Sequence, residues 1–426
     1  MYPEVAAAII LDLVEKRRTS LRSVALEYFR RHKDIEYLKP VVRVLTLNVL
    51  RNYILLDYIA EIAGLDPRIY RDIKRWLLRI LVYEVTHQIN KLKKSRVSKI
   101  ANILKLKNQF INTLKNIDVE GVRRKLIKLN RIDIAYSIPY WMILLFKNAR
   151  IPYLEKFLET LLHDPNLWIR VSTHKISRIE LVKLLKRMGY KVREDSHFFD
   201  CIEVIDKRRS LLAKTIYYHK GYYTIQDKSS ILIGHVAYPS NKIVLDTTAG
   251  AGLKTTHMVQ LGALRVIAQD IDFKRLLDAH IHAKRLGLAD RIFLINTDST
   301  KKIFNCPDIV LIDPPCTGLG RLSIQPELKL HLSRRYLNTV RRLQYQLLYN
   351  VIKNVRRGTR IIYSTCTVTV EENEDLVKMF EKEGYIEVIR HKPFIGSKSF
   401  IDERIQRLYP HLHKTQGFAV TVMERT

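Results

Sequence analysis

The chain has 426 residues, and 74 Lys and Arg against 43 Asp and Glu give it a formal net charge of +31. A surplus this large opposes compaction, and a polyanionic partner explains it best, with nucleic acid ahead of an anionic membrane. The hydrophobic fraction of 47% excludes a disordered basic tail, four cysteines are too few for a disulfide scaffold, and the apolar run Val5–Leu11 is too short for a membrane span or a signal peptide. We therefore expect a reduced, cytoplasmic protein of two or three domains that meets nucleic acid.

A small all-α domain is predicted at the N-terminus. The first 120 residues contain only one Gly and three Pro, and they are rich in Leu, Ile, Arg and Lys. Apolar residues recur at helical spacing over residues 6–14, 21–29, 41–62 and 69–85. Few breakers and this spacing together favour amphipathic helices.

The end of this domain is strongly basic. Between His87 and Arg131 there are 13 Lys or Arg, Lys91 and Lys93 among them, against two acids. A solvated helical face is the alternative explanation. Taken with the charge of the whole chain, the run predicts a surface that contacts phosphates.

A short β-α-β connector is predicted next, because prolines interrupt the helical pattern from about residue 138. Residues 167–173 and 190–193 have the pattern of strands. The helix between them, residues 177–188, begins with Ser177 and Glu180 placed as a capping box.

Alternating strands and helices after about residue 220 predict a doubly wound, mostly parallel sheet. The expected strands are residues 242–246, 265–270, 291–298, 308–313 and 359–366. The expected helices are residues 255–261, 273–286, 335–356 and 370–383.

Each of the five expected strands ends on a polar, reactive residue. These residues are Asp246, Asp270, Asp298, Asp313 and Cys366. In open parallel sheets, ligands bind outside the carboxyl ends of the strands. A single Asp there also fits a turn or a helix cap, but five such residues in order favour one site.

The loop after the first of these strands, Asp246–Lys254, contains glycines that let a ligand approach the backbone closely. It matches neither the dinucleotide fingerprint nor the phosphate loop. Asp270 would accept hydrogen bonds from ribose hydroxyls, and Asp298 would accept one from an adenine amino group. Ribose binding without a phosphate cradle favours a nucleoside cofactor, of which S-adenosylmethionine is the obvious one.

Cys316 and Cys366 are both expected at the mouth of this cleft. Two prolines fix the backbone of the loop that carries Cys316. No metal is expected, because Cys-x-x-Cys and a nearby His pair are missing, and a disulfide is disfavoured in a reducing compartment. The alternative reading, a small buried hydrophobic residue, applies best to Cys201 and Cys306.

At these residues the sequence resembles the RNA cytosine-5 methyltransferases of the Sun/NSUN type. It is most similar to their RsmB-like branch, which has a NusB-like helical domain ahead of the catalytic part. The loop Gly250-Ala-Gly-Leu-Lys254 departs from the family's usual Ala-Pro-Gly-Gly-Lys. The segments that fall in the family's order are Tyr223–Ser230, Asp246–Lys254, Asp270–Arg275, Asp298, Asp313–Cys316, Ser364–Cys366 and Pro410–Phe418.

The resemblance implies a multi-domain fold with three parts. Residues 1–135 would form a NusB-like all-helical RNA-binding domain, and residues 136–215 a small α+β connector. Residues 216–426 would form an α/β Rossmann-like class I methyltransferase domain with a mostly parallel sheet.

The resemblance also implies transfer of a methyl group from S-adenosylmethionine to carbon 5 of a cytosine in RNA, with rRNA favoured and tRNA possible. Cys366 would add to carbon 6 as the nucleophile. Cys316 would assist release, Asp313 would contact ring nitrogen 3, and Lys254 would orient the nucleophile or the base. The residues implied to bind the cofactor are Thr248, Ala249, Gly250, Ala251, Gly252, Leu253, Lys254, Asp270, Arg275, Asp298 and Asp313.

Two other functions stay open. Asp-Pro-Pro loops also occur in amino-group methyltransferases of adenine or guanine, although those sites call for an aromatic residue where this chain has Cys316. A non-catalytic RNA-binding assembly factor would explain the changes at Ala251 and Leu253, although the intact Asp313 and Cys366 argue against it.

Overall fold

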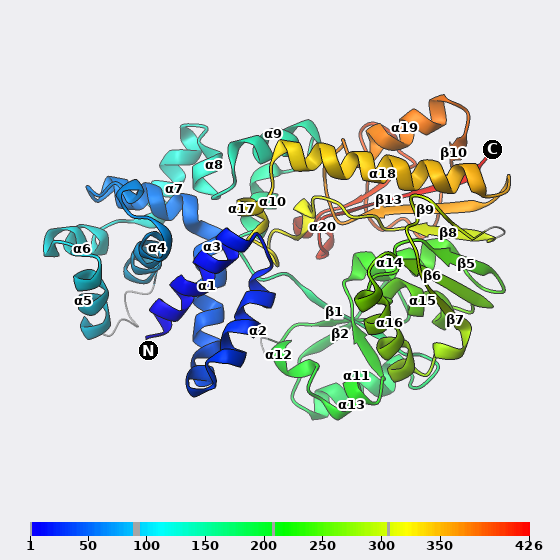
Figure 1. Ribbon diagram of the computed structural model, residues 1–426, viewed down its shortest axis with the longest axis horizontal. Helices are drawn as coiled ribbons and strands as arrows, with labels where there is room; N and C mark the ends of the chain where they lie inside the picture. Colours follow the sequence, from blue (N-terminus) through cyan, green and yellow to red (C-terminus); the bar gives the residue numbers. More distant parts are fainter. Residues whose placement is uncertain (1, 88–93, 207–208, 305–306) are drawn as a thin grey trace. The chain divides into compact units, whose positions relative to one another are not determined.

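The computed structural model describes residues 2–87, 94–206, 209–304 and 307–426 (Figure 1). Lys91, Lys93 and Cys306 lie outside the described residues. Two compact units are present, which we call the helical unit (Met1–Asp164 with Leu322–Ser333) and the sheet unit (Pro165–Arg321 with Arg334–Thr426). Within the described ranges, no helix combines the length and the apolar character that a membrane crossing requires.

The helical unit confirms the predicted all-α character of the N-terminal region. Its first four long helices match the four predicted periodic stretches, except that the fourth helix begins at Asp72 rather than at residue 69, and apolar residues such as Ile10 and Trp76 are completely buried among them. These helices are α1 (Pro3–Arg17), α2 (Leu21–Arg31), α3 (Lys39–Ile62) and α4 (Asp72–His87). The later helices are α5 (Lys94–Ile103), α6 (Asn108–Lys115), α7 (Val119–Lys128), α8 (Ile132–Ala135), α9 (Tyr140–Asn148) and α10 (Leu154–Thr160).

A segment from much later in the chain, Leu322–Ser333, belongs to the same helical unit and includes α17 (Leu328–His331). The buried Lys329 donates from Nζ to the backbone oxygens of Arg51 and Ser137, both at 2.9 Å. Lys329 and Arg51 are 278 positions apart in the sequence, so no local pattern predicts their contact.

Residues 136–215 are divided between the two units: α9 and α10 lie in the helical unit, and the strands that follow lie in the sheet unit. The three-domain boundaries at residues 135 and 215 therefore stay a prediction.

A four-stranded sheet opens the sheet unit, with the order β2-β3-β1-β4 and every pair antiparallel. Its helix α11 (Arg178–Arg187) starts with the capping box of Ser177 and Glu180, as predicted. Two of its strands were not predicted. The elements of this region are β1 (Leu167–Val171), β2 (Val192–Glu194), β3 (Cys201–Val204), α12 (Arg209–Leu212), α13 (Ile216–His219) and β4 (Tyr223–Ile225).

The large sheet confirms the predicted doubly wound α/β architecture. Its order is β11-β12-β13-β9-β8-β5-β6-β7, and the neighbours from β9 to β7 are parallel. The chain leaves β5 toward β6 on one side and later returns to β8 on the other, so the strand order reverses between β5 and β8. The central strands are β5 (Ile243–Asp246), β6 (Arg265–Asp270), β7 (Ile292–Asn296), β8 (Ile309–Ile312) and β9 (Arg360–Thr365).

The C-terminal end adds antiparallel strands that the sequence reading did not predict. β13 pairs with β9, β10 and β12, in each case antiparallel. These elements are β10 (Ile386–Val388), β11 (Ser397–Lys398), β12 (Gln406–Leu408), α20 (Pro410–His413) and β13 (Phe418–Arg425).

Helices cover both faces of the large sheet (Figure 1). Val244 packs in a cluster with residues of α14 (Lys228–Ala237), α15 (Leu253–Gln260) and α16 (Phe273–Leu286). The next residue, Leu245, packs with α18 (Arg334–Asn354) and α19 (Glu374–Lys382). Successive side chains of a strand point to opposite faces, so alternate residues of β5 serve the two layers.

An ion pair inside the sheet unit gives the first testable prediction. Glu374 of α19 and Arg407 of β12 are both buried and hydrogen-bonded to each other. Glu374→Gln leaves a buried guanidinium without its counter-charge, so we expect the free energy of unfolding in urea to fall by about 3 kcal/mol. The exposed neighbour on the same helix is the control: Asp375→Asn should change it by less than about 0.5 kcal/mol. Equal stability of the two variants would contradict the expectation.

Candidate active site

The two motif cysteines meet at the carboxyl edge of the large sheet. Cys316 lies in the loop after β8, and Cys366 directly follows β9. Their Sγ atoms are 3.2 Å apart, and both side chains are half-buried. The structure thus brings together two thiols separated by 50 positions in the sequence.

The surroundings make the two thiols unequal. The hydrogen bond from Cys316 lowers the pKa of Cys366 below its ordinary value, and the nearby cations Arg321 and Lys254 act in the same direction. The same pairing, together with burial, raises the pKa of Cys316 well above its ordinary value. Of the two thiols, Cys366 is therefore the more readily deprotonated, and the thiolate is the form of cysteine that acts as a nucleophile.

Asp313 and Lys254 lie beside the cysteine pair and are hydrogen-bonded to each other. Ser364 donates to the other oxygen of Asp313 at 3.0 Å, and the backbone N–H of Asp313 donates to Thr248 at 2.9 Å. Lys254 comes from the first turn of α15 and Asp313 from the end of β8, so the two sides of the strand-order reversal meet here.

The glycine loop between β5 and α15 packs tightly against α16. Gly250 and Gly252 have φ angles of +55° and +74°, which favour glycine. A Cβ on Gly250 would lie 2.5 Å from a guanidinium nitrogen of Arg275, and one on Gly252 would lie 2.9 Å from the Cβ of Ala279. The Pro and second Gly of the usual family loop are therefore not needed for this chain to form the turn.

Asp270 joins this loop to the end of β6. Its carboxylate accepts from the N–H of Gly250 at 2.8 Å and from that of Asp272 at 2.9 Å, and a nitrogen of Arg275 lies 3.9 Å away. A carboxylate has about four acceptor positions, so capacity for ribose hydroxyls remains. Glycines without side chains and a fixed carboxylate at a strand-order reversal fit the predicted nucleoside cofactor.

The other residues predicted to bind the cofactor lie in the loop after β5, at the start of α15 and beyond β7. The N–H of Ala249 donates to the oxygen of Gln269 at 2.9 Å, Ala251 is exposed, and Leu253 begins α15. Asp298 lies two residues beyond β7 and accepts from the N–H and the hydroxyl of Thr300, at 3.0 and 2.7 Å.

Asp246, which also ends a strand, has a different environment from the other acids. It is buried and accepts from the hydroxyl of Thr255 at 2.7 Å. Burial raises its pKa to about 6. Its contacts hold the start of α15 rather than the cysteine pair.

Sequence reasoning missed two glycines that close the site. Gly320 donates to the oxygen of Cys366 at 3.1 Å, and Gly417 donates to the oxygen of Gly320 at 2.9 Å. A Cβ on Gly320 would lie 1.9 Å from the oxygen of Gly417, so only glycine permits this contact. The only sequence signal for either glycine was the position of Gly417 in Pro410–Phe418, a segment that resembles the family.

A buried cluster outside this site was also not predicted. Asp200, His235 and His257 place possible ligand atoms within 4.8 Å of one another. The two rings bond to separate oxygens of Asp200, at 2.9 and 2.8 Å, and burial lowers the pKa of His257 to about 4. Each ring supplies a partner to one oxygen of the buried carboxylate, so hydrogen bonding accounts for the cluster.

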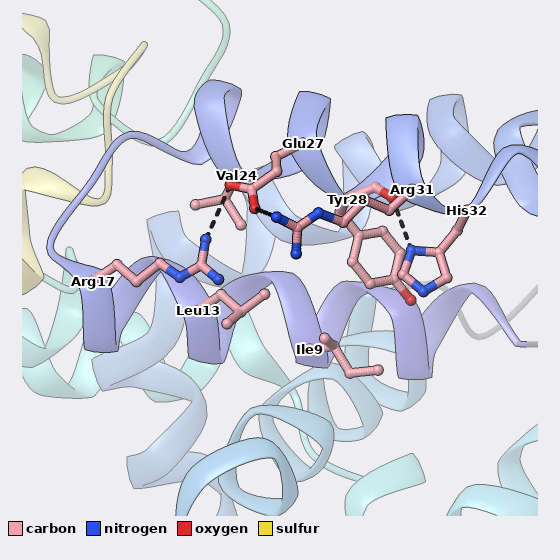
Figure 2. A pocket seen from close by; sticks show the side chains of 8 residues that line it. All are labelled: Ile9, Leu13, Arg17, Val24, Glu27, Tyr28, Arg31 and His32. Atoms are coloured by element: carbon pink, nitrogen blue, oxygen red, sulfur yellow. Dashed lines mark hydrogen bonds and ion pairs between the residues drawn. The ribbon is translucent and has the colours of Figure 1, made fainter.

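A hollow of about 260 Å³ lies between α1 and α2 in the helical unit (Figure 2). Its apolar wall includes Ile9 and Leu13, and Glu27 holds Arg17 and Arg31 at its rim, at 3.0 and 2.8 Å. None of the predicted site residues lines it.

Comparison with known proteins agrees with this geometry. Residues 235–424 match the model of the 16S rRNA methyltransferase RsmB/F family. Over 252 residues the chain is 32% identical to the tRNA (cytosine(72)-C(5))-methyltransferase of Pyrococcus horikoshii, a match that covers 57% of this chain and 62% of that enzyme. It is 26% identical to the probable ribosomal RNA small subunit methyltransferase B of Bacillus subtilis, over 96% of this chain and 99% of the relative.

Solved structures share the fold. The protein PH0851 superimposes with a TM-score of 0.77 at 23% identity, over 100% of this chain and 99% of its own. NSun6 from Pyrococcus horikoshii, solved with SFG, gives a TM-score of 0.60 at 24% identity, over 66% of this chain and 96% of its own. With these findings the predicted class of enzyme is confirmed. Residues 235–424 therefore resemble the RsmB/F family of methyltransferases, and the predicted resemblance to the RNA cytosine-5 methyltransferases of the Sun type is confirmed.

Proposed function

We propose that this chain methylates carbon 5 of a cytosine in RNA, with rRNA the favoured substrate and tRNA the alternative. The observation that carries the proposal is the pair Cys316 and Cys366 at 3.2 Å, beside hydrogen-bonded Lys254 and Asp313. The names of the relatives support the substrate class, because they include enzymes of rRNA and of tRNA.

The cofactor is S-adenosylmethionine, which supplies the methyl group when bound. Asp270 would hold the ribose, and the backbone of residues 248–254 would line the rest of the nucleoside. Asp298 would reach the adenine edge, and Arg275 would steady Asp270 from α16. The glycine turn and the fixed carboxylate of Asp270 support this assignment.

The chemistry begins with Cys366. Its thiolate adds to carbon 6 of the cytosine, and the electrons of the 5,6 double bond move toward ring nitrogen 3. Asp313, which is hydrogen-bonded to Lys254, acts as the acid that protonates that nitrogen and so stabilises the charge that develops there. Carbon 5 then has the electron density that it needs to accept a methyl group.

Release reverses the addition. After transfer, carbon 5 carries both a proton and the methyl group. Solvent water takes the carbon-5 proton, the electrons of that C–H bond restore the 5,6 double bond and the bond to the Cys366 sulfur breaks, while ring nitrogen 3 returns its proton to Asp313. Cys316, whose thiol already contacts that sulfur, assists this step. A thiol that donates to the departing sulfur makes it a better leaving group.

The target cytosine must be unstacked during this chemistry. The net charge of +31 provides affinity for phosphates. In the helical unit, α7 presents the exposed Arg124 and Lys125, which support the predicted phosphate-contacting surface. Residues 1–135 as a NusB-like RNA-binding domain and a cytoplasmic location stay predictions.

Cofactor binding gives a second prediction. Asp270→Ala removes the expected ribose acceptor, so the Kd for S-adenosylmethionine should rise by about 10- to 100-fold in calorimetry. Asp290→Asn, an exposed acid on the same unit, should leave it unchanged. An unchanged affinity in Asp270→Ala would remove Asp270 from the ribose site.

The test of the reaction is the identity of the product. The purified chain is incubated with S-adenosylmethionine and RNA from cells that lack the gene, and the product is examined by bisulfite sequencing and nucleoside mass spectrometry. The proposal expects 5-methylcytosine at a defined position. Methyl groups on the amino group of adenine or guanine would instead show that the chain is an amino-group methyltransferase.

A further inference from the structure

The carboxylate of Glu372 lies behind both cysteine loops and is completely buried. Its Oε1 accepts from the N–H of Thr317 at 2.8 Å and from the side-chain amide of Gln344 at 3.0 Å. Its Oε2 accepts from the hydroxyls of Thr317 at 2.5 Å and of Thr369 at 2.9 Å. Both oxygens are therefore satisfied by donors that carry no charge, so the negative charge itself is not neutralised by these contacts.

The partners of Glu372 are the residues next to the two cysteines. Thr317 directly follows Cys316, Thr367 directly follows Cys366, and the two hydroxyls are 2.9 Å apart. Gln344 of α18 also donates to the oxygen of Pro315, on the other side of Cys316, at 2.9 Å. One buried network therefore fixes the backbone on both sides of Cys316 and ties it to the residue after Cys366.

The charge of Glu372 also acts on the thiols. It is one of the groups that raise the pKa of Cys316, after the hydrogen bond with Cys366 and burial, and Asp313 acts in the same direction. Asp313 also raises the pKa of Cys366, whereas Arg321 and Lys254 lower it, so among the nearby acids Glu372 is the one that acts on Cys316 and not on Cys366. A negative charge near Cys316 and positive charges near Cys366 give these two chemically identical side chains different pKa values.

We propose that Glu372 is a positioning residue that holds the two cysteine loops in register and keeps the shared negative charge on Cys366 rather than on Cys316. The proposal rests on the function proposed above, because it explains how one cysteine acts as the nucleophile while the other remains a thiol. Glu372 does not touch the RNA base in this scheme; it acts through Thr317 and Thr367.

Alkylation of the free protein tests this proposal. The wild-type chain is treated briefly with iodoacetamide near neutral pH, digested, and the initial labelling rates of the Cys316 and Cys366 peptides are measured by mass spectrometry. Wild-type protein should label at Cys366 first. In Glu372→Gln the ratio of Cys316 to Cys366 labelling should rise by about tenfold, because loss of the carboxylate charge lets the Cys316 thiolate form more readily.

Two further variants distinguish the effect of the Glu372 charge from the effect of its hydrogen bonds. Asp375→Asn removes an exposed carboxylate three residues away and should keep the wild-type ratio. Thr317→Val keeps the charge of Glu372 but removes one of its hydrogen bonds, so it should loosen the Cys316 loop and raise the ratio by a smaller factor. If Glu372→Gln does not fold, Thr317→Val decides, and thermal melting identifies a variant that has not folded.

The outcomes of this experiment are distinct from those of the reaction. Labelling needs neither RNA nor cofactor, so a wild-type chain that forms no 5-methylcytosine overturns the proposed function alone. A folded Glu372→Gln or Thr317→Val variant with the wild-type labelling ratio overturns the role of Glu372.

Discussion

Cys366→Ala is expected to lose both turnover and covalent attachment to RNA, with kcat reduced by at least about 10⁴-fold. The variant removes the only sulfur whose pKa is lowered among the described cysteines, so nothing adds to carbon 6. The measurement uses RNA with 5-fluorocytosine at the target position, since fluorine cannot leave carbon 5 as a proton does and the adduct persists. Wild-type protein should shift on a denaturing gel, and Cys366→Ala should not.

Cys316→Ala is the matched control, because its sulfur lies only 3.2 Å from that of Cys366. It should still attach to RNA, and with ordinary cytosine it should accumulate an adduct that releases slowly. If the two variants exchange these behaviours, Cys316 is the nucleophile and the proposed assignment is reversed.

Asp313→Asn is expected to reduce kcat by about 10²- to 10⁴-fold, the range that general acid catalysis contributes. The amide cannot transfer a proton to ring nitrogen 3, so the charge that develops there is poorly stabilised. The apparent KM for S-adenosylmethionine should change less than kcat, and initial-rate kinetics at saturating RNA separate the two.

Ser364→Ala should reduce kcat by less than Asp313→Asn does. It removes the hydrogen bond of 3.0 Å to one oxygen of Asp313 and leaves the acid in place. We expect a loss of about tenfold in kcat, which is about the cost of one hydrogen bond. An Asp313→Asn enzyme with the wild-type kcat would contradict the role of Asp313.

The strands that lead into the site could be predicted because parallel βαβ units repeat one local pattern. The strand at residues 265–270 was predicted with its observed bounds. The next expected strand, residues 291–298, is shorter in the structure and ends at Asn296, since Asp298 turns the chain by accepting from Thr300. The side chain of an Asp can end a strand as well as follow one.

The missed elements are those that tertiary contacts stabilise. β3 contains Glu203, an acid that does not suit a buried strand from sequence alone. In the structure it is paired with Arg193 and accepts from Asn166 at 2.8 Å. Burial of a paired charge depends on neighbours that are distant in sequence, so the strand has no local signal.

The same contrast between local sequence patterns and tertiary contacts applies to the candidate site. Asp313 and Cys366 could be predicted because each directly follows a strand, whereas Cys316 in the loop after β8 and Lys254 in α15 were singled out by the resemblance. Glu372 and Gly320 could not, since an acid before a helix and a glycine in a loop are common, and only the fold shows that they support the cysteines.

The most direct test of the account is to locate the bond between protein and RNA. Wild-type protein is trapped on RNA with 5-fluorocytosine, the adduct is digested with protease and nuclease, and the modified peptide is sequenced by mass spectrometry. The account predicts a nucleotide attached to the sulfur of Cys366. A nucleotide on Cys316, or a product formed without any attachment to the protein, would contradict it.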